Sequence, residues 1–230
     1  MNINDKQRQE WVKKTLLALP KGRILDAGAG ELRNKQYCSH LDYISQDFCQ
    51  YDGKGDSKGL QNQIWDTSKI DIVSDIANIP VEDASFDYVV CTEVFEHIKY
   101  PVDALKEFNR ILKPGGKIIV TAPFCSLTHM APYHMYSGFN QYFYTAVMPE
   151  CGYENVTFEP NGNYFQYMEQ ELKRIGFMSK KYGNSKLSFL YKVMIVPALA
   201  LYRYLAKKST DTSELLCFGY NVTATKLAKK

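Results

Sequence analysis

The sequence predicts an α/β domain in which a mostly parallel sheet is covered by helices on both faces. Short apolar runs alternate with segments of helical periodicity along the chain, as in folds with a parallel sheet. Three of the first runs end in an acidic residue, where ligand-side loops of such a sheet begin. The 230 residues are 45% hydrophobic and 23% charged, which suits one folded core. We therefore expect one domain over residues 1–230.

The first strand, expected at residues 23–26, leads directly into a glycine turn. Asp26 ends the strand, and Gly28 and Gly30 flank Ala29. Glycine has no Cβ, so the backbone of this turn can approach a ligand closely. A tight turn without a ligand explains the same residues equally well.

A dinucleotide fingerprint is the nearest alternative for this turn. Its third glycine position holds Arg33, and the acidic Glu31 follows the turn, so both features suit a pyrophosphate poorly. S-adenosylmethionine, with an adenosine end and a zwitterionic end, fits better. Asp26 could help hold its ammonium group directly or through water.

The second and third strands repeat the pattern of a strand followed by an acid. Asp47 and Phe48 end the strand expected at 42–46, and Asp47 lies about 20 residues after Asp26. This spacing is typical of a carboxylate that accepts both ribose hydroxyls. Asp75 follows the strand expected at 70–74 and could read an adenine amino group, with Ile76 packing on the ring.

Two further runs identify a family. Residues 84–98 read A-S-F-D-Y-V-V-C-T-E-V-F-E-H-I, and residues 110–121 read R-I-L-K-P-G-G-K-I-I-V-T. With the preceding motifs, the chain from about residue 20 to 125 closely resembles the class I S-adenosylmethionine-dependent methyltransferases, particularly the type 11 group.

The resemblance implies a Rossmann-like, seven-stranded sheet whose last strand is antiparallel, and it implies S-adenosylmethionine as the cofactor. It places the first turn at the methionine part, Asp47 at the ribose, and Thr92 and Glu93 at the pocket floor. The expected cofactor-binding residues are Asp26, Gly28, Ala29, Gly30, Asp47, Phe48, Asp75, Ile76, Thr92 and Glu93.

The remaining elements complete this layout. Helices are expected at 6–19 and 101–112, and strands at 86–91 and 116–121. Pro114-Gly115-Gly116 is expected to be a structural turn into the fifth strand. The segment between Asp47 and Ile70 lacks helical periodicity and is expected to be an elaborated loop. Late strands are expected at 154–159 and 216–225.

The segment around residues 122–150 is expected to form an acceptor-side lid. It contains His129 and His134 among many aromatic residues. A histidine is readily poised to remove a hydroxyl proton near neutral pH, so both are candidate catalytic residues. The alternative is that both only brace the loop. His134 and Ser137 stand where type 11 relatives often carry Asp and Arg, so the acceptor class does not transfer directly. His97 is expected to be structural or cofactor-side.

An extra helical segment is expected around residues 165–208. Its apolar run, 189–206, contains Lys192, Pro197 and Arg203, which argues against a membrane-spanning helix. We expect a helix that packs on the domain or on a partner. The alternative is weak membrane-surface or oligomer contact, which the basic and aromatic flanks would favour.

The net charge and the cysteine content limit which binding partners and which kinds of site are expected. The formal net charge of +3 gives no reason to expect nucleic-acid binding. The six cysteines include no C-x-x-C pair, so neither a disulfide framework nor a metal site is expected. No apolar signal segment opens the chain. The expected location is cytoplasmic, with peripheral attachment at the inner membrane face as the variant.

The sequence thus predicts a metal-independent, S-adenosylmethionine-dependent methyltransferase. The expected reaction is O-methylation of a small or saccharide-linked acceptor, for example in surface-glycan assembly. The alternatives are N- or C-methylation of another metabolite, or a non-catalytic partner subunit that binds the cofactor.

Overall fold

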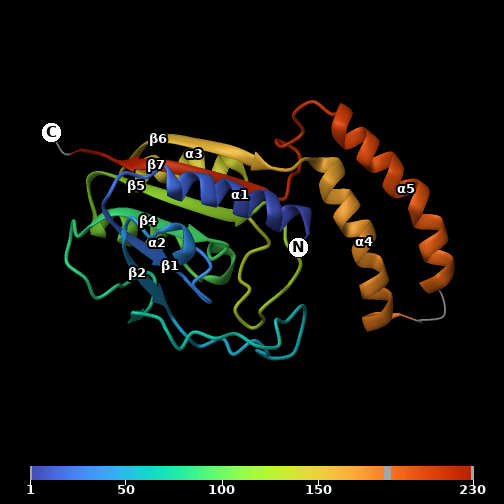
Figure 1. The fold of residues 1–230 in the computed structure, drawn as a ribbon, viewed down its shortest axis with the longest axis horizontal. Helices are drawn as coiled ribbons and strands as arrows, with labels where there is room; N and C mark the ends of the chain where they lie inside the picture. The colour runs from blue at the N-terminus through green and yellow to red at the C-terminus, as the bar shows by residue number, and fades with distance from the viewer. Residues whose placement is uncertain (1, 184–187, 229–230) are drawn as a thin grey trace. The chain divides into compact units, whose positions relative to one another are not determined.

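The computed structural model describes residues 2–183 and 188–228, and its strands form one seven-stranded sheet (Figure 1). The strand order is β3-β2-β1-β4-β5-β7-β6. The strands are β1 (Arg23–Ala27), β2 (Asp42–Asp47), β3 (Ile72–Val73), β4 (Phe86–Thr92), β5 (Leu112–Pro123), β6 (Tyr153–Asn161) and β7 (Gly219–Lys226).

The pairing confirms a mostly parallel sheet whose last strand is antiparallel. β1 pairs in parallel with both β2 and β4, and β4 pairs in parallel with β5. β7 runs antiparallel to β5. The carboxyl ends of β1, β2 and β4 therefore meet at one edge, where an open α/β sheet binds its ligands.

The chain divides into two compact units, residues 1–159 with 219–230 and residues 160–218. The first unit holds the sheet, apart from the end of β6, with helices α1 (Ile3–Leu17), α2 (Pro101–Ile111) and α3 (Gln141–Glu150). The second holds α4 (Tyr164–Tyr182) and α5 (Ser188–Lys208), which form the extra helical segment.

A buried apolar face fixes α1 to the sheet. Val12 and Leu16 are fully buried and pack in one cluster with Ile24 of β1, Val90 of β4 and Ile119 of β5. The helix begins after Asn2, whose side chain accepts a hydrogen bond from a backbone amide of the first turn. This packing brings the first turns of α1 to the ligand-binding edge.

The predicted helix at 101–112 is confirmed as α2, but the expected turn after it is wrong. β5 begins at Leu112, so Pro114-Gly115-Gly116 lies within the strand. Gly115 adopts a positive φ, and the pairing with β4 shifts register between Phe86 and Tyr88. The glycines thus accommodate an irregular strand start.

The loop prediction for residues 48–69 is confirmed, because no helix forms there. By contrast, α3 lies inside the expected lid segment and no helix was predicted for it. Asn140 begins this helix by accepting hydrogen bonds from the amides of Tyr142 and Phe143.

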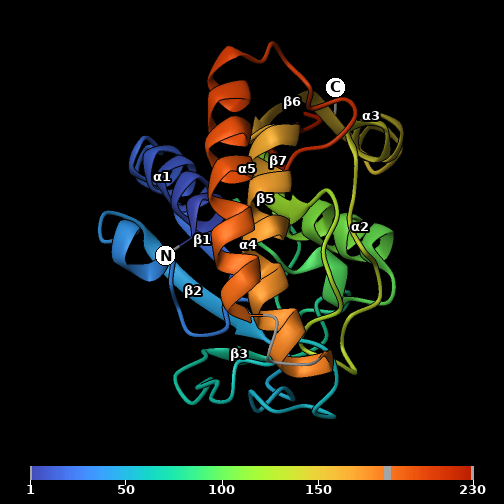
Figure 2. The same ribbon diagram turned by 90° about the vertical axis from the view of Figure 1, so that its right-hand side faces the viewer.

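The second unit is a helical hairpin. Figure 2 shows α4 and α5 side by side. Glu169 on α4 is only 6% exposed, and its carboxylate pairs with Lys173 and with Arg203 of α5, each at 2.7 Å. An asparagine at position 163 and Gln166 form a capping box at the start of α4.

Three apolar side chains of the 189–206 run are exposed, and its packing on the domain or on a partner stays a prediction. Val193, Met194 and Val196 are each about 60% exposed or more, whereas Ile195 is buried. Contact of this segment with a membrane surface or an oligomer stays a prediction. Among the described residues, no helix combines the length and apolarity needed to cross a membrane.

Candidate active site

A cavity of about 980 Å³ opens at the carboxyl ends of the strands. It lies where the sequence predicts the cofactor, since nine of the ten expected cofactor-binding residues line it. These are Gly28, Ala29, Gly30, Asp47, Phe48, Asp75, Ile76, Thr92 and Glu93.

The glycines of the first turn are required by protein neighbours as well as by any ligand. Gly28 and Gly30 have φ values of 70° and 50°. A Cβ on Gly28 would lie 2.5 Å from Val94, and one on Gly30 would lie 2.5 Å from Trp65. Both positions therefore need glycine for conformation and for space. Trp65 also lines the cavity, which the sequence did not predict.

Asp26, the tenth expected residue, lies behind the cavity wall. It is fully buried and accepts hydrogen bonds from Asn34 (3.0 Å) and from the Tyr43 hydroxyl (2.6 Å). Asn34 itself lines the cavity. Burial raises the pKa of the Asp26 carboxyl from 3.8 to about 6, although both hydrogen bonds oppose this shift. Asp26 thus supports the wall through Asn34.

The raised pKa of Asp26 predicts a pH-dependent stability. The Asp26 carboxyl binds its proton more tightly in the folded state than in the unfolded state. Protonation of Asp26 therefore stabilises the fold, and this stabilisation is fully present below pH 3.8. It is lost as the pH rises through about 6, at a total of roughly 3 kcal/mol. Urea unfolding of wild type and Asp26→Asn between pH 4 and 8 measures it. The free energy of unfolding of Asp26→Asn should increase relative to that of the wild type as the pH rises across this window. A difference that does not depend on pH would contradict the raised pKa of Asp26.

Asp47 joins the ends of β1 and β2. One carboxylate oxygen accepts from the Gly30 amide at 3.0 Å, and the other accepts from the Cys49 amide at 2.9 Å. Only 7% of the residue is exposed. The carboxylate is held in place from behind and faces the cavity, as a ribose-binding acid would be.

An ion pair between Arg8 of α1 and Glu93 borders the cavity, and the sequence did not predict it. Arg8 donates to Glu93 at 2.9 Å and to Asp5 at 2.8 Å. Glu93 also accepts from the Thr121 hydroxyl. The only sequence signal was an arginine in a polar helix, which a solvated helix face would show equally.

Two loops interlock over the cavity. The Leu60 amide donates to Thr128 at 3.0 Å, and the Met130 amide donates back to Leu60 at 2.8 Å. The Asp56 amide donates to Ala131. The loop after β2 therefore holds the lid segment after β5, and it fixes His129 beside the cavity.

Three histidine rings gather at this end. The ring centroids of His97 and His129 are 4.6 Å apart, those of His129 and His134 are 4.8 Å apart, and those of His97 and His134 are 6.0 Å apart. His97 and His129 line the cavity. His134 lies outside that lining, with Nε2 3.1 Å from the Ser126 hydroxyl.

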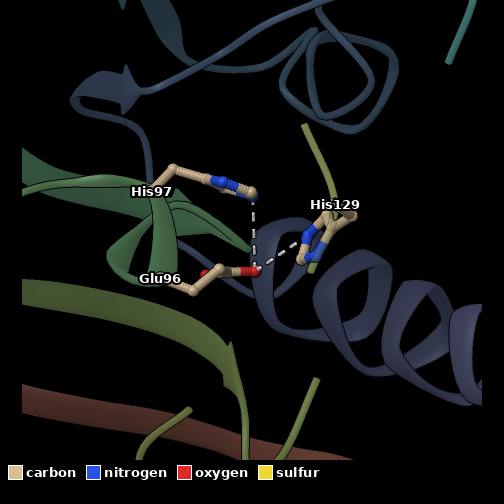
Figure 3. Close-up of side chains that lie close together, drawn as sticks. All are labelled: Glu96, His97 and His129. Atoms are coloured by element: carbon tan, nitrogen blue, oxygen red, sulfur yellow. Dashed lines mark ion pairs between the residues drawn. The ribbon is translucent and has the colours of Figure 1, made fainter. Parts of the chain in front are cut away.

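Glu96 lies against two of these rings (Figure 3). Its Oε1 is 3.7 Å from Nε2 of His97 and 3.9 Å from Nε2 of His129. Glu96 is 1% exposed, and burial, with the charge of Glu93, raises its pKa well above the ordinary value. Burial lowers the pKa of His97 to about 3, helped by His129, and burial also lowers the pKa of His134. The sequence predicted His129 and His134, but the tertiary structure adds Glu96 and His97.

Comparison with known proteins agrees with this geometry. Residues 25–120 match the family model described as a methyltransferase domain. The chain is 36% identical over 78 residues to the demethylmenaquinone methyltransferase of Staphylococcus haemolyticus, across 34% of this chain and 30% of that protein. It is 33% identical over 63 residues to the ubiquinone biosynthesis O-methyltransferase of Xanthomonas oryzae pv. oryzae, across 27% of this chain and 26% of that protein. The chain spans less than a third of the length of these curated relatives.

Solved structures share the fold. The phosphoethanolamine N-methyltransferase 2 of Haemonchus contortus, in complex with S-adenosyl-L-methionine, aligns with a TM-score of 0.53 at 16% identity, over 96% of this chain and 53% of that chain. The [4+2]-cyclase SpnF aligns with a TM-score of 0.57 at 18% identity, over 97% of this chain and 81% of that chain. At such identities the likeness establishes the fold alone.

The seven-stranded fold and the cavity at its strand ends thus agree with the similarity of residues 25–120 to a methyltransferase domain.

Proposed function

We propose that this protein transfers the methyl group of S-adenosylmethionine to an oxygen of a small or saccharide-linked acceptor. The observation that carries this proposal is the cluster of His97, His129 and His134 at one end of the cofactor cavity. A hydroxyl must lose its proton to become a good nucleophile, and imidazole is the side chain best suited to accept it near neutral pH.

The cavity has room for both reactants. Its volume of about 980 Å³ lies at the upper end of the range for ligand pockets, roughly 300–1,000 Å³. Asp47, Asp75 and Ile76 would hold the ribose and adenine. His129 and Tyr133 line the same cavity from the lid segment, so an acceptor would enter beside them.

The chemistry needs positioning and one proton acceptor. The acceptor oxygen forms a bond to the methyl carbon while the carbon–sulfur bond breaks, and the electron pair of that bond returns to sulfur. The hydroxyl proton goes to a histidine of the lid segment, His129 or His134. The two interlocked loops would exclude water and align the oxygen with the methyl group.

The names of the curated relatives add a second acceptor class. One relative is named for O-methylation in ubiquinone biosynthesis and another for methylation of demethylmenaquinone. A phenolic hydroxyl would also suit a cavity lined by Phe48, Trp65 and Tyr133. One solved structure with this fold is named as a [4+2]-cyclase, so the fold is not restricted to proteins named as methyltransferases. A protein that binds the cofactor without transferring its methyl group is therefore kept as the alternative.

Transfer of a labelled methyl group tests the proposal. The purified protein is incubated with methyl-labelled S-adenosylmethionine and, separately, with saccharide, phenolic and amine acceptors. We expect label on oxygen of the saccharide or phenolic acceptor and demethylated cofactor in equal amount. Label on amines or carbon alone would contradict O-methylation, and cofactor binding without turnover on any acceptor would favour the non-catalytic alternative.

A further inference from the structure

The contacts of His97 and His129 orient both rings in the same way. Nδ1 of His97 lies 2.9 Å from the carbonyl oxygen of Tyr133, and Nδ1 of His129 lies 2.8 Å from that of Leu127. A carbonyl oxygen can only accept, so each Nδ1 must carry the hydrogen. In the neutral rings, each Nε2 therefore presents a lone pair.

Both Nε2 atoms lie within 4 Å of one carboxylate oxygen, Oε1 of Glu96. The dashed lines in Figure 3 join Oε1 of Glu96 to one ring nitrogen of each histidine. The distances from Oε1 to the two Nε2 atoms are 3.7 Å for His97 and 3.9 Å for His129. Three electron-rich atoms that face one another repel unless a proton or a cation lies among them. These distances are too long for a hydrogen bond, which needs less than about 3.2 Å.

The spacing suits a metal ion instead. The three ligand atoms all lie within 4.8 Å of one another. Ligand atoms around a tetrahedral ion with bonds of about 2.1 Å lie roughly 3.4 Å apart. The distances of 3.7 Å and 3.9 Å to Oε1 are a few tenths of an ångström longer, and no pair of ligand atoms is separated by more than 4.8 Å. Small side-chain rotations would close the difference.

A second observation points to a missing ligand. Oε2 of Glu96 is buried and makes no hydrogen bond to any of the residues that the structure describes. The residue as a whole is 1% exposed. A buried carboxylate oxygen without a partner is costly, whereas coordination of a cation by this carboxylate would compensate its charge.

We infer that Glu96, His97 and His129 form a binding site for a divalent transition-metal ion of the zinc type. Two imidazole nitrogens and one carboxylate oxygen are a donor set that suits such ions better than Mg²⁺ or Ca²⁺. The backbone carbonyls behind both rings are the outer partners that metal-binding histidines usually have. Because both histidines line the cavity, the ion would keep positions open toward the acceptor.

The site deepens the proposed function, on which its role in catalysis rests. A cation there would bind the acceptor hydroxyl and lower its pKa, and His129 would serve as a ligand. His134, whose ring centroid lies 4.8 Å from that of His129, would then accept the proton. Metal binding itself can be measured without any acceptor.

The test is titration of the full-length, chelator-treated protein with Zn²⁺ by calorimetry and with Co²⁺ by visible absorption. We expect one ion per chain and the absorption of a nitrogen- and oxygen-ligated site. His129→Gln should weaken binding on the order of 100-fold or more, because a ligand is lost. His134→Gln, which removes a neighbouring histidine that is no ligand, should leave the affinity unchanged.

The buried variants could unfold the chain, so His129→Gln, on the lid, is the primary variant and Glu96→Gln the second. S-adenosylmethionine binding and thermal unfolding verify that each variant is folded. Absence of stoichiometric binding, or equal affinity in wild type and His129→Gln, would overturn the inference. Metal binding without methyl transfer would overturn only the proposed function, and methyl transfer by a protein that binds no metal would overturn only the metal site.

Discussion

Replacement by alanine of the histidine that accepts the hydroxyl proton, His129 or His134, is expected to lower kcat by about 10²–10⁴-fold, the usual contribution of a general base. Both side chains come from the lid segment, whereas Asp47 and Asp75 come from the sheet edge on the cofactor side. The affinity for S-adenosylmethionine should therefore stay nearly unchanged. Single-turnover kinetics under saturating cofactor measure the effect.

The two variants should differ in one further respect. If His129 is a metal ligand, His129→Ala lowers both turnover and Zn²⁺ affinity, whereas His134→Ala lowers turnover alone. Unchanged turnover in both variants would show that neither histidine is the base. The acceptor would then be already ionised or intrinsically nucleophilic, and positioning would be the contribution of the protein.

Asp47→Ala is expected to weaken S-adenosylmethionine binding by about 2–4 kcal/mol, because two charge-assisted hydrogen bonds to the ribose would be lost. Part of the loss would arise from the protein itself, since Asp47 also accepts hydrogen bonds from the amides of Gly30 and Cys49. Calorimetry with the cofactor and with its demethylated product gives the two affinities.

Asp52 offers a matched control. It also accepts hydrogen bonds from two backbone amides, those of Lys54 and Gly55, but it does not line the cavity. Asp52→Ala should therefore leave cofactor affinity unchanged. Equal losses in both variants would show that the effect comes from loop distortion, and no loss in Asp47→Ala would remove Asp47 from the ribose site.

The sequence by itself determined the sheet and its ligand edge. The hydrophobic periodicity and the signals for helix ends lie within each segment itself. For this reason β1, β2, β4 and α2 lie near their expected positions. Because each acid follows its own strand, parallel pairing brought Asp47 and Asp75 to one cavity without further information.

Other features depended on contacts between distant segments, and only the tertiary structure decided them. Arg8 meets Glu93 because α1 packs on the sheet, 85 residues away in sequence. Asp26 turned out to be buried behind Asn34, which its position at a strand end could not reveal. The three exposed apolar residues of α5 depend on its pairing with α4.

The histidine cluster shows most clearly which features the sequence predicts and which features depend on the tertiary structure. The sequence singled out His129 for its residue type and its loop. Its pairing with Glu96 and His97 requires the loop after β2 to hold residues 128–131 against the end of β4. The local sequence pattern shows which side chains a segment carries. The distance between two segments depends on the packing of the whole chain. For that reason the sequence predicted a methyltransferase, and the structure alone placed two imidazoles around a buried carboxylate.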